Sequence, residues 1–202
     1  SHPVPDINGV RVTSRIIKIL KELKKNDLLI FLISGGASSL LVSPIGGLTL
    51  NDKQKINSLL LKSGATISEI NAVRKHLSLV KGGQLMKYAY PAKVLTLAIS
   101  DVPGDDLGVI GSGPTYPDES TRNDALKVLN KYNIKFSNKI KCILKNSNNE
   151  TPNFEDKVFK NSNIKLIAKP QDALNKAAKT LASYGFKSMV LSDSIEGESE
   201  DI

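Results

Sequence analysis

Apolar positions along the chain follow two spacings, one typical of helices and the other typical of buried strands. In the region 10–25 they recur every three or four residues, which predicts an amphipathic helix. Two largely apolar runs, at 28–33 and 94–99, predict buried strands instead. Because the inner strands of parallel sheets are apolar on both faces, we expect the first run to be an interior parallel strand.

The rest of the chain continues this alternation of helices and strands. Thr66 and Glu69 have the spacing of a capping box, which predicts that a helix begins at Ile67. The polar segment 146–163 is expected to be a surface excursion. Further helices are predicted at 51–63, 122–132, 137–144 and 171–184, and further strands at 164–168 and 189–191. This order predicts a βαβ architecture.

A glycine-rich loop follows the first predicted strand. It reads Ser34-Gly35-Gly36-Ala37-Ser38-Ser39 and precedes an apolar pair that could open a helix. Free backbone N–H groups and the positive end of a helix both favour an anion, such as a phosphate or a carboxylate. The chain contains neither a Walker A motif nor a G-x-G-x-x-G dinucleotide motif. A tight turn whose serine caps a helix is the alternative interpretation.

A second polar loop, SDVPGDDLGVIGSGPT at 100–115, follows the predicted strand at 94–99. It contains Asp101, Asp105 and Asp106, and carboxylates in such a place can accept a proton or hold a hard cation. Ligands of open α/β sheets bind outside the carboxyl ends of the strands. The loop therefore predicts a site at that edge, with a solvated turn as the alternative.

Two cations accompany the helix that begins near Ile67. Continued at 100° per residue, one arc of this helix is apolar and a neighbouring arc carries Arg74 and Lys81. These cations are expected at the border of the buried face, where they could serve a site or simply snorkel to solvent. His76 is interpreted as a hydrogen-bonded border residue rather than a catalyst.

Composition narrows the class of protein. The 202 residues carry a formal net charge of +8, spread along the chain without a dense basic tract, which favours anionic small molecules over nucleic acid. Cys142 is the only cysteine, so an internal disulfide is excluded, and we expect it to be a small core residue. No apolar run is long enough for a transmembrane helix, so no membrane partner is expected and the cytoplasm is the simplest location.

Taken together, these motifs resemble those of the class II glycerate kinases, the glycerate 2-kinase family associated with the MOFRL domain. The order and spacing match from His2 to about Thr115, and a weaker match reaches Glu196-Gly197-Glu198. The matching motifs are His2-Pro3-Val4-Pro5-Asp6, the loop at 34–38, Leu48-Thr49 with Asp52-Lys53-Gln54, Ser63-Gly64-Ala65, Val73-Arg74-Lys75-His76-Leu77-Ser78 with Lys81-Gly82-Gly83, the segment 100–106, and Ser112-Gly113-Pro114-Thr115.

The resemblance implies a fold, a reaction and an incomplete domain. We expect an α/β fold, a Rossmann-like three-layer αβα arrangement with a mostly parallel sheet. Residues 1–202 are expected to form one such domain, truncated at both ends, without the MOFRL-type C-terminal domain. The resemblance also implies transfer of the γ-phosphoryl group of ATP to the 2-hydroxyl of D-glycerate, with Mg²⁺, by the longer protein. The 202-residue chain by itself is expected to be inactive.

The same resemblance implies roles for individual residues. Asp101 is the expected base for the substrate hydroxyl, Arg74 and Lys81 are expected to offset negative charge, and Asp105 and Asp106 are expected to contact Mg²⁺. The residues expected to bind substrate or phosphate are Ser34, Gly35, Gly36, Ser38, Ser39, Gly82, Gly83, Gly104, Ser112, Gly113 and Thr115.

Two other functions remain open at this point. A nicotinamide-dependent reductase of hydroxypyruvate or tartronate would bind the same small acids, although the dinucleotide motif is missing. A non-catalytic ligand-binding or assembly domain is the second alternative. A homodimer is kept as an assembly to test.

Overall fold

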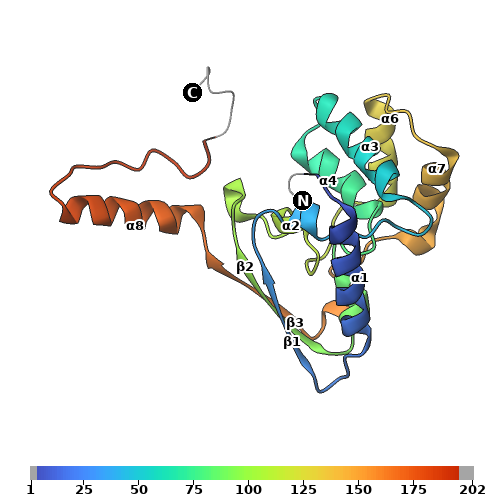
Figure 1. The fold of residues 1–202 in the computed structure, drawn as a ribbon, viewed down its shortest axis with the longest axis horizontal. Coiled ribbons are helices and arrows are strands. Elements are labelled where there is room, and N and C mark those ends of the chain that lie inside the picture. The colour runs from blue at the N-terminus through green and yellow to red at the C-terminus, as the bar shows by residue number, and fades with distance from the viewer. Residues whose placement is uncertain (1–3, 196–202) are drawn as a thin grey trace.

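The structure is a computed structural model that describes residues 4–195, and it combines a parallel sheet with helices (Figure 1). Three strands are found in this part of the chain: β1 (Leu28–Ile33), β2 (Lys93–Ile99) and β3 (Ser162–Ala168). They are all parallel and lie in the order β1-β2-β3. The expected α/β class with a parallel sheet is therefore confirmed.

Most of the predicted helices begin and end close to their predicted positions, whereas the helix at Gln84–Ala89 was not predicted. The carboxylate of Asp6 accepts a hydrogen bond from the Gly9 N–H at 2.9 Å, so the first helix starts three residues earlier than predicted. The capping box of Thr66 and Glu69 is confirmed. The α-helices are α1 (Ile7–Lys21), α2 (Ala37–Leu40), α3 (Leu50–Lys62), α4 (Ile67–His76), α5 (Gln84–Ala89), α6 (Arg122–Lys131), α7 (Asn138–Lys145) and α8 (Pro170–Ser183).

Four short 3₁₀ helices complete the described elements, two of them in the second glycine-rich loop. They are η1 (Pro103–Asp105), η2 (Ile110–Ser112), η3 (Ser147–Asn149) and η4 (Lys157–Phe159).

Two larger cores, and a small cluster of Ile33, Ala98 and Ile110, hold the molecule together. One lies among α3, α4, α6 and α7, which gather on one side of the sheet in Figure 1, and it is built from aliphatic side chains such as Leu60, Val73 and Leu129. The other lies where α1 and α5 pack against β1 and β2. The site described below lies between the loops of the sheet and the first of these cores.

The position of β1 corrects one prediction. Among the described strands it pairs with β2 alone, so it is an edge strand and not an interior one. Its alternate residues Leu28, Ile30 and Leu32 are 58%, 54% and 71% exposed. A continuous apolar run predicts a strand that is buried on both faces. The described residues bury one face of β1 and leave the other face exposed.

The C-terminal part of the described chain corrects a second prediction. No strand forms at 189–191, because Met189 and Leu191 are 80% and 75% exposed and pair with no described strand. Helix α8 has no buried residue in the described structure. In Figure 1 it extends away from the sheet, on the side opposite to the other helices. The motif Glu196-Gly197-Glu198, like His2-Pro3, lies outside the described residues.

Three local predictions also change. Cys142 is exposed, because Ile140, Ile143 and Leu144 take the buried positions of α7. The segment 146–163 is not wholly a surface excursion, since Thr151 within it is 4% exposed.

The third change concerns α4, which ends at His76. Lys81 therefore lies beyond the helix, in the turn before α5, and is 1% exposed. It is a buried residue and not the border residue that continued helical periodicity predicted.

We expect Leu129→Ala on α6 to lower the free energy of unfolding by about 2–5 kcal/mol, because Leu129 is 0% exposed and its loss leaves a cavity. Urea denaturation followed by circular dichroism measures the change. Leu126→Ala, one turn away and only partly buried, is the matched control and should cost less. Equal losses for the two variants would contradict the core described here.

Candidate functional site

The two glycine-rich loops meet at the carboxyl end of the sheet. Ile33 of β1 pairs with Ala98 of β2, so the loops that follow these strands begin side by side. A Cβ placed on Gly35 would clash with the carboxylate of Asp101, so the first loop can approach this carboxylate only because residue 35 is glycine. Both loops therefore lie at the edge of the sheet where the sequence predicts a site.

Lys81 joins the two loops through its buried ammonium group. Its Nζ donates to the Ser38 carbonyl at 2.7 Å and to the Gly111 carbonyl at 3.3 Å. The hydroxyls of Ser38 and Ser112 lie 2.9 Å apart and form a second link. Three segments that are distant in the sequence are therefore held around one point.

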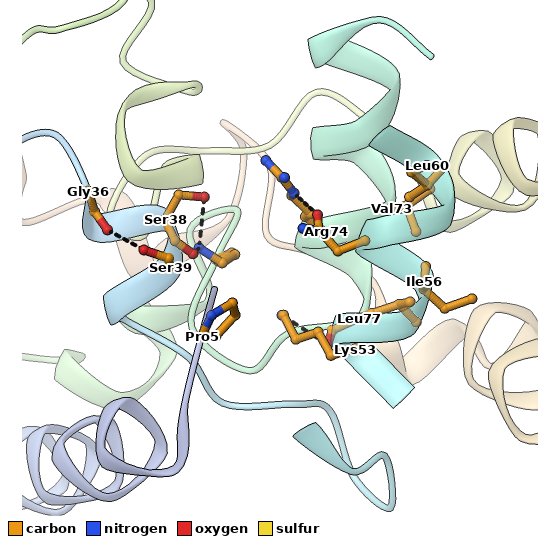
Figure 2. A pocket seen from close by; sticks show the side chains of 12 residues that line it. Pro5, Gly36, Ser38, Ser39, Lys53, Ile56, Leu60, Val73, Arg74 and Leu77 are labelled. Atoms are coloured by element: carbon orange, nitrogen blue, oxygen red, sulfur yellow. Dashed lines mark hydrogen bonds between the residues drawn. The ribbon is translucent and has the colours of Figure 1, made fainter. Parts of the chain in front are cut away.

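A cavity of about 230 Å³ opens beside this point, between α2 and the pair α3 and α4 (Figure 2). Part of its wall is apolar and comes mainly from the facing sides of α3 and α4. The remainder is polar and contains three cations and no carboxylate. The lining residues are Pro5, Gly36, Ser38, Ser39, Lys53, Ile56, Asn57, Leu60, Val73, Arg74, Leu77 and Lys81.

Lys53 is the lining cation that the sequence analysis did not single out. It lies on α3, three residues before Ile56 and seven before Leu60, so it shares their buried face and is 7% exposed. Its Nζ reaches the Leu77 carbonyl at 3.5 Å. A lysine in the middle of an apolar arc was the signal that could have identified it.

Arg74 lies on α4, and in Figure 2 its side chain extends in the cavity between Ser38 and the apolar wall. Its Nε donates to the Asn57 side-chain oxygen at 2.5 Å. This bond orients the guanidinium, whose terminal N–H groups make no other hydrogen bond within residues 4–195. A fork of two N–H groups matches the geometry of a carboxylate or phosphate.

The three cations destabilise one another. Burial, followed by the charge of Arg74, lowers the pKa of Lys53 from its ordinary value of 10.5 to about 7. Burial, with the charges of Lys53 and Arg74, lowers the pKa of Lys81 well below its ordinary value. Burial also lowers the pKa of Arg74. A site with this surplus of positive charge and no carboxylate in its lining is suited to an anion.

The acidic residues of the second loop lie apart from the cavity lining. Asp105 forms an ion pair with Lys169 at 3.0 Å, and hydrogen bonds from Ser100 and Lys169 lower its pKa. Its Oδ1 is buried without a hydrogen-bond partner among the described residues. Asp106 accepts a hydrogen bond from the Gly108 N–H at 2.7 Å. No group of three or more acidic, His or Cys side chains within residues 4–195 is placed to hold a metal ion.

Several residues expected to bind phosphate hold the second loop in place instead of lining the cavity. The N–H groups of Gly82 and Gly83 donate to the carbonyls of Ser112 and Gly113 at 2.9 and 2.7 Å. A side chain at Gly82 would collide with Asp118, and a side chain at Gly83 would collide with Phe159 and Tyr116. The buried hydroxyl of Thr115 accepts a hydrogen bond from Thr96 at 2.9 Å.

The other predicted residues divide into two groups. Gly36, Ser38 and Ser39, together with Arg74 and Lys81, line the cavity. Ser34, Gly35 and Gly104 lie exposed in the two loops, outside the cavity lining.

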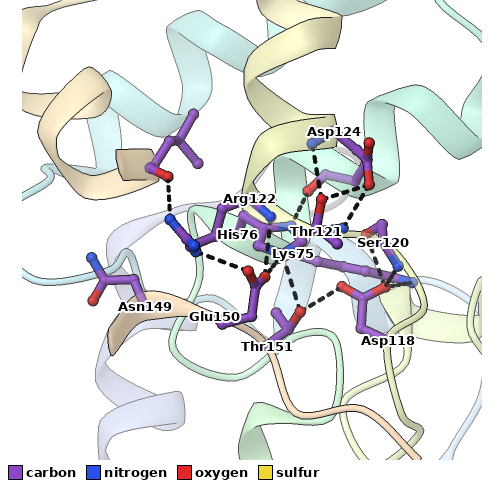
Figure 3. Close-up of polar contacts among 12 residues, drawn as sticks. Lys75, His76, Asp118, Ser120, Thr121, Arg122, Asp124, Asn149, Glu150 and Thr151 are labelled. Carbon is purple, nitrogen blue, oxygen red and sulfur yellow. Dashed lines mark hydrogen bonds and ion pairs between the residues drawn. The ribbon is translucent and has the colours of Figure 1, made fainter. Parts of the chain in front are cut away.

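A separate polar network holds the C-terminal end of α4 (Figure 3). His76 is 0% exposed, and its ring nitrogens lie 2.8 Å from the Ala72 carbonyl and 2.9 Å from a Glu150 carboxylate oxygen. Lys75 forms an ion pair with Asp118 at 3.0 Å. His76 is thus hydrogen-bonded, as predicted, but it is fully buried and does not lie at the border of the buried face. The network fixes the helix that carries Arg74.

Comparisons with known proteins agree with the fold and the motifs. Residues 1–145 match the sequence family DUF4147, described as a domain of unknown function. The chain is 46% identical over 201 residues to the D-glycerate 2-kinase of Thermotoga maritima, covering 99% of this chain and 46% of that protein. It is 47% identical over 202 residues to a putative hydroxypyruvate reductase of Agrobacterium vitis, covering 100% of this chain and 51% of that protein.

A human glycerate kinase is 37% identical over 197 residues, which are 96% of this chain and 37% of that protein. The chain thus spans about half, or less, of the length of these curated relatives. The crystal structure of the glycerate kinase from Thermotoga maritima matches with a TM-score of 0.83 at 46% identity, over 95% of this chain and 44% of that one. A Pyrococcus horikoshii protein matches with the same TM-score at 37% identity, over 100% of this chain and 47% of that one.

None of the helices within residues 4–195 has the length and apolar character needed to cross a membrane.

We expect the free energy of unfolding to rise with pH above 7, because of Lys53. Between about 7 and 10.5 the unfolded chain holds the Lys53 proton and the folded chain has released it, so the slope is positive and reaches about 1.4 kcal/mol per pH unit for this group. Below pH 7 the cost of the buried charge is present in full. Urea denaturation at pH 7, 8 and 9 measures the slope.

Lys53→Met should lose this share of the slope, whereas Lys55→Met, an exposed lysine on the same helix, should keep it. Equal slopes in the two variants would show that Lys53 is not a buried group with a lowered pKa.

Proposed function

The chain belongs to the DUF4147 family, and we propose that it forms the glycerate-binding part of an ATP-dependent glycerate 2-kinase. The observation that carries the proposal is the cavity with three cations and no carboxylate in its lining, at the loop that follows β1. Relatives named D-glycerate 2-kinase and glycerate kinase support it. The reaction would transfer the γ-phosphoryl group of ATP to the 2-hydroxyl of D-glycerate and give 2-phosphoglycerate.

The size and chemistry of the cavity favour glycerate over the nucleotide as its occupant. Glycerate has three carbons, one carboxylate and two hydroxyls, which suits a volume of about 230 Å³. Arg74 would grip its carboxylate with two parallel hydrogen bonds. Ser38 and Ser39 would face its hydroxyls, and the apolar wall would pack against its carbon chain.

Asp101 is the proposed base. It follows β2 and lies against Gly35, at the edge where the first loop begins. During transfer the 2-hydroxyl oxygen would form a bond to the γ-phosphorus while the bond to the β,γ-bridging oxygen breaks. The hydroxyl proton would pass to the Asp101 carboxylate, and ADP would leave with the bridging oxygen.

Asp105 is the residue best placed to help hold Mg²⁺. Its Oδ1 is buried without a hydrogen-bond partner in the described part of the chain, which suits one ligand from the protein. Mg²⁺ usually takes one or two carboxylates together with phosphate oxygens and water. When bound, the ion would supply neutralisation of phosphate charge. Asp106 would contribute at most through water, since Gly108 uses one of its oxygens.

We further propose that residues 1–202 are one partial Rossmann-like domain whose site is completed by segments outside this chain. A C-terminal domain of the MOFRL type would form the other wall of the cleft and bind part of the ATP. A cytoplasmic location and a homodimer also remain parts of the proposal.

The proposal is tested by phosphoryl-transfer assays on two proteins. One is the 202-residue chain alone, and the other is a chimera in which this chain replaces the matching half of the Thermotoga maritima D-glycerate 2-kinase. Both receive ATP, Mg²⁺ and D-glycerate, and NMR identifies the phosphoglycerate isomer. We expect 2-phosphoglycerate from the chimera alone, and a folded chimera that forms no product would contradict the proposal.

A reductase is the second candidate, because two relatives from Agrobacterium vitis carry the name putative hydroxypyruvate reductase. It predicts oxidation of NADH by the chimera in the presence of hydroxypyruvate. We expect none, and a turnover comparable with that of the kinase assay would favour the reductase. An assembly domain without enzymatic activity would bind neither ATP nor D-glycerate.

We expect Asp101→Asn in the chimera to lower kcat by about 10²–10⁴-fold, because the amide cannot accept the hydroxyl proton. The KM for D-glycerate should change less than kcat, since Arg74 and the lysines of the cavity, and not Asp101, would hold its carboxylate. Glu119→Gln, which neutralises an exposed carboxylate elsewhere, is the matched control. Near-normal turnover of Asp101→Asn would exclude this residue as the base.

A further inference from the structure

We infer that Lys53 is a third anion-binding residue of the cavity and makes it a site for a carboxylate and a phosphate together. The site would therefore bind the phosphorylated hydroxy acid more tightly than the hydroxy acid itself. This inference rests on the proposed function, because it names the state of the substrate that the cavity fits best.

The position of Lys53 is unusual for a lysine with a structural role. It is 7% exposed, and the hydrogen bond of its Nζ in the described structure, to the Leu77 carbonyl, is 3.5 Å long. An ammonium group has three donors, and a bond of this length is at the outer limit for one of them. Within residues 4–195 no carboxylate forms an ion pair with Lys53, so no negative charge in this part of the chain offsets its buried positive charge.

The groups that face Lys53 increase this surplus of charge. Arg74 comes from α4 and Lys81 from the turn before α5, and both are cations. The N-terminal segment contributes Pro5, and α2 contributes serines. The nearest acid in the sequence, Asp52, is turned away, because its carboxylate accepts hydrogen bonds from the N–H and hydroxyl of Thr49 at 2.9 and 2.8 Å.

Arg74 and Lys81 alone would suffice for a simple hydroxy acid. D-Glycerate carries one negative charge, which Arg74 can pair with bidentately. Lys53 would then remain a buried charge without a partner, and such a charge is costly. A ligand with a single carboxylate therefore leaves part of the positive charge of the cavity without a negative partner.

A phosphorylated hydroxy acid matches the cavity better. The phosphate adds about −1.5 to −2 near neutral pH, so the total approaches −3 and favours the protonated forms of the two lysines that line the cavity beside Arg74. It also brings three acceptor oxygens, which can take the unused donors of Lys53. Binding that becomes stronger during phosphoryl transfer lowers the barrier to that transfer, so Lys53 would favour the forward reaction. The same tight binding would slow release of the product.

Calorimetric titration of the 202-residue chain tests the inference with D-glycerate, inorganic phosphate and 2-phosphoglycerate at pH 6.5. We expect 2-phosphoglycerate to bind at least about 10-fold more tightly than D-glycerate. Lys53→Met should weaken 2-phosphoglycerate binding by about 10–100-fold, the range for a hydrogen bond to a charged group, and D-glycerate binding by less than about 3-fold. Lys55→Met is the control and should change neither affinity.

Proton uptake gives a second readout that does not depend on the affinities. The pKa of Lys53 is about 7 in the free chain, so the residue is mostly neutral at pH 8.5 and must gain a proton to pair with phosphate. Titrations in buffers of different ionisation enthalpy should show uptake of protons with 2-phosphoglycerate. The uptake should fall in Lys53→Met, leaving only the share of Lys81.

The outcomes separate this inference from the proposed function. Equal 2-phosphoglycerate affinities in Lys53→Met and Lys55→Met, or no binding of any of the three anions to the unmodified chain, would overturn the inference even if the chimera is an active kinase. Lys53-dependent binding of 2-phosphoglycerate together with an inactive chimera would support the inference and count against the kinase.

Discussion

The site depends on one buried ammonium group. Lys81 donates to the Ser38 carbonyl and the Gly111 carbonyl, and so it holds the loop after β1 against the loop after β2. The two glycines that follow it extend the link, because their N–H groups bond the carbonyls of Ser112 and Gly113. The hydrogen bond between the hydroxyls of Ser38 and Ser112 adds a further link between the two loops. The polar network of His76 and Glu150 then fixes α4, which brings Arg74 to the same place.

Local patterns were enough to predict most of the elements and both loops, but not α5 or the absence of a strand at 189–191. Capping boxes and apolar spacing depend on neighbours within one turn, so the starts of α4 and α6 could be predicted from the sequence. The glycine loops could be placed because each follows an apolar strand. Six of the predicted site residues owe their proximity to parallel pairing of β1 and β2, namely Gly35, Gly36, Ser38, Ser39, Asp101 and Ser112.

What the sequence did not show depends on tertiary packing. Periodicity cannot reveal that α4 stops at His76, and it therefore placed Lys81 on a helix border instead of in a buried turn. Lys53 was missed because a lone lysine in an apolar arc is usually a solvated residue, and only the packing of α3 shows its burial. The edge position of β1 depends on which strands are present, which an apolar run does not specify.

Helix α8 has a mechanical consequence for the second loop. It buries no residue against the described chain, yet Lys169 just before it is paired with Asp105, and the Ser100 N–H donates to the Ala168 carbonyl beside it. These two contacts join the end of β3 to the second loop, and α8 continues directly from this end of the strand. A protein surface that bound α8 would therefore lie next to the residues that contact Ser100 and Asp105.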